Sequence, residues 1–318
     1  MVKIFVLAVC VITLQADDLT TLYRTQGLYA VKQALDKSLM SRDYWLDVLK
    51  KEDTRFGYFE SLHSFLSCNK GSASLQYYER NTKNRFEQTN AFDALTGKMD
   101  GDKQTEGDHR TPTGVYSLTK KLEKLDPFYG PLAYVTSYPN LYDKIRGKNG
   151  SGIWIHGVPN NQTRETFTKG CIALENNDIK CLDKKLDFKN TLLIIDEKNL
   201  AQTNEKNLSI LLSSLFKWRY AWLHNDTKEY LSFYDTTFKR FDGMDIQKFK
   251  AYKTRIFKKN ESKQIRFSDL IVLPYPGVSN TYLIRFHEDY NATGYSFNGE
   301  KTLIVVLREN SFSILTER

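Results

Sequence analysis

Between residues 68 and 196 the chain alternates short β-type runs with dense turns, and this pattern restricts the fold more than any other feature. The runs "ASLQYYER", "LAYVTSY", "GIWIHG" and "TLLIID" are separated by stretches such as "LTGKMDGDKQTEGDHRTPTGVYSL", which is crowded with Gly, Asp, Thr and Pro. Short strands divided by turn residues are typical of a compact β structure. We therefore predict a sheet-rich domain over residues 68–197.

Helical patterns flank this domain on both sides. From residue 19 to about residue 66, apolar residues recur every three or four positions, so residues 17–67 are predicted to form a helical arm that covers the sheet-rich domain or pairs with a second copy. Residues 198–207 are polar and are interpreted as a linker. Residues 208–318 begin with an amphipathic helical stretch and continue as strand-like runs, which predicts a small α+β domain and an α+β fold class overall.

The first 16 residues have the pattern of an export signal. A basic start at Lys3 is followed by an apolar run, Ile4 to Leu14, and by Ala16 before an acidic pair. The run is too short to span a membrane comfortably. We predict cleavage after Ala16 and a periplasmic mature protein, with an N-terminal core helix as the alternative.

Export makes the cysteines informative, because an oxidising compartment favours disulfides. Cys68, Cys171 and Cys181 remain after removal of the signal, so one thiol is left over in any pairing. A Cys68–Cys181 bridge and three reduced thiols are both open. The sequence contains no CxxC and no HExxH motif, and no metal or organic cofactor is predicted.

The formal net charge of +8 is modest and spread along the chain. Adjacent lysines, such as Lys184-Lys185, are typical of solvated surfaces, so nucleic acid is not a predicted partner. A basic surface favours an anionic partner such as a polyanionic wall.

One histidine and one cysteine stand out in "GIWIHG" and "TKGCIALEN". In a strand, Trp154 and His156 share one face, and Gly157 allows the chain to turn directly after the histidine. Gly170 before Cys171 allows a tight turn that aims backbone N–H groups at an oxyanion. A thiolate is the reactive form of cysteine, and a neighbouring imidazole promotes it. The pair alone is also compatible with a core histidine and a buried structural thiol.

The surrounding motifs favour catalysis. "HG" at a strand end, "TKGCIAL" after an interval, and "EGDHRTPTGVYSL" upstream together resemble the L,D-transpeptidase catalytic-domain family over residues 69–196. With "GYFESLHSFLSCNK" the chain also resembles exported peptidoglycan-trimming enzymes that have a helical N-terminal arm and a C-terminal nuclear-transport-factor-2-like domain. This resemblance implies such a cone-shaped domain over residues 208–318.

The resemblance also implies roles for individual residues. Cys171 is the expected nucleophile and His156 the general base and later the acid, while backbone N–H groups at Gly170 and Cys171 hold the oxyanion. Gly157, Thr168, Lys169 and Trp154 are expected to shape the pocket or bind substrate. The implied substrates are peptidoglycan stem peptides, cut at the bond between diaminopimelate and the terminal D-alanine.

Two positions depart from the family pattern. Lys169 stands where many members have His, and Ala173 stands where many carry an Arg. Because that Arg is expected to help bind substrate carboxylate in cross-linking members, its loss favours an L,D-carboxypeptidase that trims tetrapeptides to tripeptides. A cross-linking L,D-transpeptidase and a catalytically silent wall-binding scaffold are the alternatives.

The C-terminal domain carries aromatic residues at helical spacing that either line a pocket or form plain core: Trp218, Trp222, Tyr230 and Tyr234. Glu300 and Lys301 either project into such a pocket or are surface charges at a strand end. We interpret this domain as a positioning or binding module without a second catalytic centre.

Overall fold

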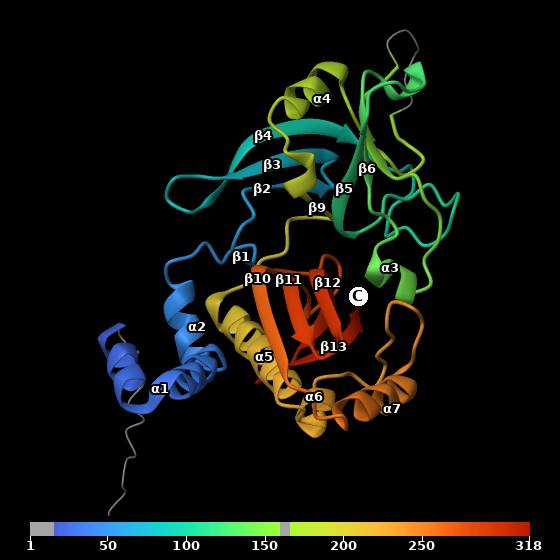
Figure 1. Ribbon diagram of the computed structural model, residues 1–318. Helices are drawn as coiled ribbons and strands as arrows, with labels where there is room; N and C mark the ends of the chain where they lie inside the picture. The colour runs from blue at the N-terminus through green and yellow to red at the C-terminus, as the bar shows by residue number, and fades with distance from the viewer. Residues whose placement is uncertain (1–15, 160–165) are drawn as a thin grey trace, which may run out of the picture.

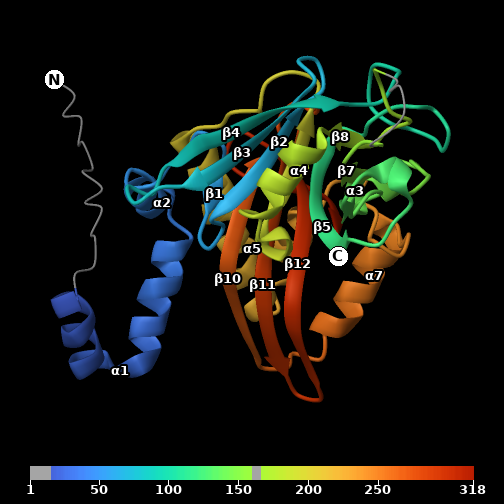
Figure 2. The same ribbon diagram turned by 90° about the horizontal axis from the view of Figure 1, so that it is seen from above.

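The computed structural model describes residues 16–159 and 166–318. The predicted signal peptide therefore lies almost wholly outside the described residues. Figures 1 and 2 show a helical N-terminal arm beside a body made of two β units. The fold class is α+β, as predicted. In the described part of the chain, no helix combines the length and the apolar character needed to cross a bilayer.

The arm consists of α1 (Ala16–Leu39), which is interrupted at Gly27 by a non-helical backbone conformation, and α2 (Arg42–Leu49). Helix α2 buries Trp45 and Leu49 against α5 of the C-terminal domain. The prediction of helix to about residue 66 was wrong beyond Leu49. Residues after α2 instead form β1 (Tyr58–Phe59) and β2 (Ser64–Asn69), because their aromatic side chains pack in the core between the two β units.

The predicted sheet-rich domain is a closed barrel with the strand order β2-β3-β4-β8-β7-β6-β5-β9. Its strands after β2 are β3 (Ser74–Arg80), β4 (Phe86–Leu95), β5 (Gly114–Leu122), β6 (Ala133–Thr136), β7 (Trp154–His156), β8 (Ile172–Leu174) and β9 (Leu192–Asp196). Short helical elements connect them: η1 (Pro127–Tyr129), α3 (Leu141–Ile145), α4 (Asn176–Asp183) and η2 (Phe188–Asn190). Closure removes free strand edges and encloses an apolar core.

The C-terminal domain is a curved sheet covered by helices on one face (Figures 1 and 2). Its helices are α5 (Glu205–Leu223), α6 (Thr227–Ser232) and α7 (Ile246–Phe257), and its strands are β10 (Lys263–Pro274), β11 (Thr281–Ala292), β12 (Tyr295–Leu307) and β13 (Phe312–Glu317). The sheet order is β1-β10-β11-β12-β13, so a segment that precedes the barrel supplies an edge strand. The four aromatic residues at helical spacing are buried in the core of this domain.

The two β units share an apolar cluster, which fixes their relative position. Val115 and Ile194 of the barrel pack in one cluster with Ile271, Leu283 and Ile304 of the C-terminal sheet. Burial of such side chains contributes roughly 1.5–3 kcal/mol each. The barrel and the C-terminal sheet therefore form one continuous body.

Smaller predictions were also tested. Helix α4 begins at Asn176 with Glu175 as its N-cap. Cys68 is buried, Cys181 is exposed, and both are free thiols, so the Cys68–Cys181 bridge is not formed in this structure. Burial raises the pKa of the Cys68 thiol to about 12, which keeps it protonated and unreactive.

Candidate active site

Strands β7 and β8 bring the predicted nucleophile and base together. They are parallel neighbours, with Ile155 opposite Ile172 and His156 opposite Ala173. Register partners in adjacent strands project from the same face, and so do residues two apart in one strand. Continuing the register by one residue places Cys171 opposite Trp154. The side chains of Cys171 and His156 therefore leave the same face as diagonal neighbours.

The protonation of His156 is set by the backbone beside it. Its ring is buried, and Nδ1 lies 2.5 Å from the carbonyl oxygen of Gly157. A carbonyl oxygen only accepts, so Nδ1 carries a proton, and in the neutral form of the ring the lone pair lies on Nε2. The Tyr129 ring meets His156 edge to face at 5.1 Å. The hydrogen bond and the ring contact thus fix the orientation of the imidazole.

Glycine is required on both sides of the pair. A Cβ at Gly157 would lie 2.4 Å from Asn176 Oδ1 and 2.7 Å from Pro131 Cδ, distances that real side chains do not show. Gly170 has a φ of 128°, and a Cβ there would lie 2.7 Å from the Arg110 carbonyl oxygen. Both turns therefore require a residue that has no Cβ atom.

Thr168 closes the turn that carries Cys171. Its hydroxyl donates to the Cys171 carbonyl at 2.7 Å and accepts from the Gly170 N–H at 3.0 Å. The Gly170 N–H is thereby occupied, which does not fit its predicted role as an oxyanion donor. That role passes, as a proposal, to the N–H of Cys171 itself.

The Cys171 thiol is partly covered and donates to the Gly152 carbonyl oxygen at 3.4 Å. Burial raises the pKa of Cys171, while the backbone N–H of Trp154 and the positive charge of Lys103 lower it in part. Lys103 is buried and pairs with Asp108 at 2.7 Å. Burial acts to raise the pKa of Asp108, but hydrogen bonds from Lys103 and three backbone N–H groups hold it well below its usual range. The cation that influences the sulfur is thus Lys103, which the sequence analysis missed.

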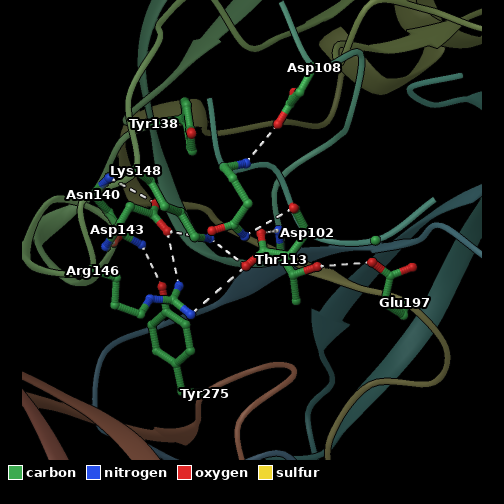
Figure 3. A network of polar contacts seen from close by, with 12 residues as sticks. Asp102, Asp108, Thr113, Tyr138, Asn140, Asp143, Arg146, Lys148, Glu197 and Tyr275 are labelled. Atoms are coloured by element: carbon green, nitrogen blue, oxygen red, sulfur yellow. Dashed lines mark hydrogen bonds and ion pairs between the residues drawn. The ribbon is translucent and has the colours of Figure 1, made fainter. Parts of the chain in front are cut away.

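The loop that carries Lys103 is anchored by a polar network (Figure 3). Asp102 accepts from Lys148 Nζ at 2.5 Å and from the Thr113 N–H at 2.8 Å. Lys148 also lies 3.0 Å from Asp143, whose side chain is fully buried. Because the charged groups are paired and covered, the network holds this loop rigidly against the Cys171 turn.

Lys169 is exposed, in contrast to Lys103. We expect Lys103→Met to slow alkylation of Cys171 by iodoacetamide about three- to tenfold at pH 7, because loss of the cation raises the thiol pKa further and leaves less thiolate. Alkylation rates followed by mass spectrometry between pH 6 and 10 measure this shift. Lys169→Met removes the adjacent exposed charge and serves as the control, with an unchanged profile. An equal effect of both substitutions would contradict the assignment.

Asn176 ties the two catalytic segments together. It is the first residue of α4, two residues after the end of β8, and its side chain accepts from the Val158 N–H at 2.9 Å and donates to the Val158 carbonyl at 2.8 Å. This pair of bonds fixes the backbone just after His156 and Gly157. The signal in the sequence was a polar residue shortly after an apolar strand. The same pattern is typical of an ordinary helix start, so it did not single out Asn176.

Removal of this tie should weaken catalysis more than folding. We expect Asn176→Ala to reduce kcat about ten- to a hundredfold, because small misplacement of a catalytic group has effects of this size. The free energy of unfolding should fall by about 1–3 kcal/mol. Steady-state kinetics and thermal melts measure both. Asn177→Ala, which changes the exposed neighbour, should alter neither, and equal kinetics for the two variants would contradict the role of Asn176.

The remaining predicted residues are placed as follows. Trp154 is half-buried, and its ring lies 5.1 Å from that of Tyr129 at the edge of the site, a position suited to contact with substrate. Ala173 is buried opposite His156. Among residues 16–159 and 166–318, no group of three or more His, Cys, Asp and Glu side chains could hold a metal ion.

Comparison with known proteins agrees with this architecture. Residues 65–195 match the L,D-transpeptidase catalytic domain (YkuD), and residues 210–318 match the Cds6 C-terminal NTF2-like domain. The chain is also similar to the crystal structure of the helical cell shape determining protein Pgp2 from Campylobacter jejuni. The two sequences are 38% identical, the match covers 88% of this chain and 99% of that chain, and the TM-score is 0.81. The chain therefore belongs to the L,D-transpeptidase catalytic-domain family, in the form that carries a C-terminal NTF2-like domain.

Two further relatives cover different extents of the chain. Bd1075 from Bdellovibrio bacteriovorus is 26% identical over 84% of this chain and 96% of that chain, with a TM-score of 0.65. The putative L,D-transpeptidase YafK from Escherichia coli K12 is 33% identical over 79 residues. That match spans 25% of this chain and 29% of YafK, so it concerns only part of the catalytic domain.

Proposed function

We propose that the protein is an exported cysteine L,D-carboxypeptidase that removes the terminal D-alanine from peptidoglycan tetrapeptide stems. The observation that carries this proposal is the placement of Cys171 and His156 on one face of an L,D-transpeptidase domain, with buried Ala173 where many members have Arg. Similarity to a protein described as determining helical cell shape supports a role in shaping the wall.

The proposed reaction begins with proton transfer from the Cys171 thiol to His156 Nε2. The sulfur attacks the carbonyl carbon of the bond between diaminopimelate and D-alanine, and the Cys171 N–H stabilises the oxyanion. His156 then protonates the departing amine of D-alanine as the carbon–nitrogen bond breaks. Water, deprotonated by His156, then attacks the thioester carbonyl. The carbon–sulfur bond breaks, which frees Cys171 and releases the tripeptide as a carboxylate.

Ala173 favours water over an amine as the acceptor. Its methyl group offers no charge to the carboxylate of an acceptor stem, whereas an arginine would. Cross-linking transpeptidation is the second candidate, because the same thioester can be attacked by an amine. A non-catalytic wall-binding scaffold would leave Cys171 without a role.

Native substrate tests this proposal. Purified sacculi treated with the protein and then digested with a muramidase should lose tetrapeptide fragments and gain tripeptide fragments in equal amount. An increase in cross-linked dimers would favour the transpeptidase, and an unchanged composition would favour the scaffold.

The N-terminal arm supports a second proposal, a homodimer. Helix α1 exposes large apolar side chains that a monomer would leave in water: Tyr23, Leu28, Tyr29 and Leu35. Sedimentation equilibrium of the full chain tests this, and a monomer at micromolar concentration would contradict it.

A further inference from the structure

A polar trough runs along the seam between the barrel and the C-terminal sheet. Two cavities of about 580 and 560 Å³ lie there, each of a size that accommodates a ligand. Both are lined by Ser117 of β5, Arg285 of β11 and Glu300 of β12, so they meet at these three residues. None of the predicted catalytic residues lines either cavity. We call these joined cavities the seam trough.

The trough lies on the sheet face opposite the helices. Along β11, Ile284 and Phe286 face the core beneath α5, while Leu283 packs toward the barrel. Because side chains alternate along a strand, Arg285 shares the face of Leu283. Along β12, Lys301 lies over the Trp222 ring on the helix side, at 5.6 Å from the ring centroid, and Glu300 therefore points outward. The alternative predicted for Glu300, a pocket residue of the cone-shaped domain, does not hold.

Arg285 is the central group of the trough. Its Nη1 donates to Ser117 Oγ at 3.2 Å, which joins the two domains. Its Nε is covered by protein and has no hydrogen-bond partner. The nearest carboxylate oxygen, Glu300 Oε1, is 3.5 Å away on a side chain that is 62% exposed. Such an exposed partner contributes little and moves aside easily.

The electrostatics favour an anion at this point. Burial lowers the pKa of Arg285, and Glu300 opposes that effect only in part. The guanidinium nevertheless stays charged at neutral pH. A buried charge with an unused donor is stabilised when a carboxylate accepts from it, and guanidinium and carboxylate match in a two-bond geometry.

The shape favours an extended ligand. One cavity continues past Asn140 and Lys144 at α3, and the other continues past His63 and Lys189 beside η2. Hydroxyl, amide and charged groups line both directions, which suits a polar polymer. After α3 the chain leads to Gly152, whose carbonyl oxygen accepts from the Cys171 thiol, so the α3 wall of the trough and the nucleophile belong to the same barrel domain.

We propose that the seam trough binds a segment of the peptidoglycan strand, with a stem-peptide carboxylate held by Arg285, while another stem occupies the Cys171 site. This inference rests on the proposed substrate class and adds a second point of attachment. Attachment at two points raises the effective concentration of stems at the nucleophile. The trough should therefore matter for polymeric substrate and not for a single soluble fragment.

Binding can be tested without turnover. In a Cys171→Ala background, the full chain is co-sedimented with purified sacculi over a range of salt concentrations. Arg285→Gln should weaken binding about tenfold, which is the effect expected of one charge-assisted contact. Arg266→Gln is the matched control, because Arg266 lies on the neighbouring strand, pairs with Asp289 and is 74% exposed outside the trough. Equal binding of the two variants would overturn the proposal.

A second variant guards against misfolding of the first. Thr302→Trp places an indole in the trough and leaves every charge in place, since Thr302 lines the cavity near α3. It should weaken sedimentation with sacculi to a similar degree, and unchanged binding would overturn the proposal even if Arg285→Gln does not fold. In the active chain, the ratio of kcat/KM on sacculi to kcat/KM on soluble disaccharide tetrapeptide should fall about tenfold for either variant. Because sedimentation needs no catalysis, a wild-type chain that binds sacculi but does not cleave them would refute the proposed reaction and leave the trough standing.

Discussion

Replacing Cys171 by alanine is expected to reduce release of D-alanine from disaccharide tetrapeptide by about 10⁴-fold or more, because the proposed mechanism requires the sulfur to form the covalent intermediate. The effect on folding should be small. The thiol makes only weak hydrogen bonds to the backbone, such as that to the Gly152 carbonyl at 3.4 Å, and alanine fits the same turn. Product formation measured by mass spectrometry and melting temperature measured by circular dichroism check both parts.

The free cysteines provide the control for this experiment. Cys181 is exposed on α4 and plays no part in the site, so Cys181→Ala should keep the wild-type rate. Treatment of wild-type protein with iodoacetamide should abolish activity in parallel with modification of Cys171. Activity retained in Cys171→Ala would refute the assignment of the nucleophile.

Replacing His156 by glutamine is expected to lower kcat by about 10²–10⁴-fold, the usual contribution of a general base. Glutamine can reproduce the hydrogen bond to the Gly157 carbonyl, but its amide acts neither as a base nor as an acid at neutral pH. The rate that remains should therefore rise with pH as solvent hydroxide generates thiolate, since burial raises the Cys171 pKa. A pH–rate profile from pH 6 to 10 measures this change.

The comparison variant for His156→Gln is His224→Gln, in the C-terminal domain. The His224 ring lies 4.2 Å from that of Tyr220 and has no connection to the barrel site. Its substitution should leave both the rate and the profile unchanged. A profile for His156→Gln identical to that of wild type would show that another group acts as the base.

The sequence predicted the parts of the fold whose patterns are local. β-type runs became β3, β6, β7 and β9, but α5 begins at Glu205, inside the predicted linker 198–207. Closure of the barrel was not predictable, because it depends on pairings such as β2 with β9, which are far apart in the chain. The helical prediction failed beyond Leu49 because spaced aromatic residues there fill the core between two domains.

The candidate site shows the same division. Cys171 and His156 were predicted from a motif and from the glycines beside them, and the register of β7 and β8 puts their side chains on the same face. Lys103 and Asn176 were missed, because each acts on the site through loop geometry that no spacing rule contains. The predicted use of the Gly170 N–H does not fit the structure, because that N–H already donates to the Thr168 hydroxyl at 3.0 Å.

A hydrogen bond at the seam links the barrel to the C-terminal domain. Asn140 Nδ2 donates to the Tyr275 hydroxyl at 2.8 Å, and Asn140 also caps α3 next to Asp143 (Figure 3). The polar network that anchors the Lys103 loop therefore reaches the C-terminal sheet. Substitutions at the seam should therefore be assayed both for substrate binding and for their effect on the Lys103 loop.

The product formed from purified disaccharide tetrapeptide tests the central claim most directly. The protein is incubated with this single substrate, and the products are identified by mass. The account predicts disaccharide tripeptide and free D-alanine in equal amounts, with no dimer. Accumulation of cross-linked dimers, or intact tetrapeptide after prolonged incubation with folded protein, would contradict it.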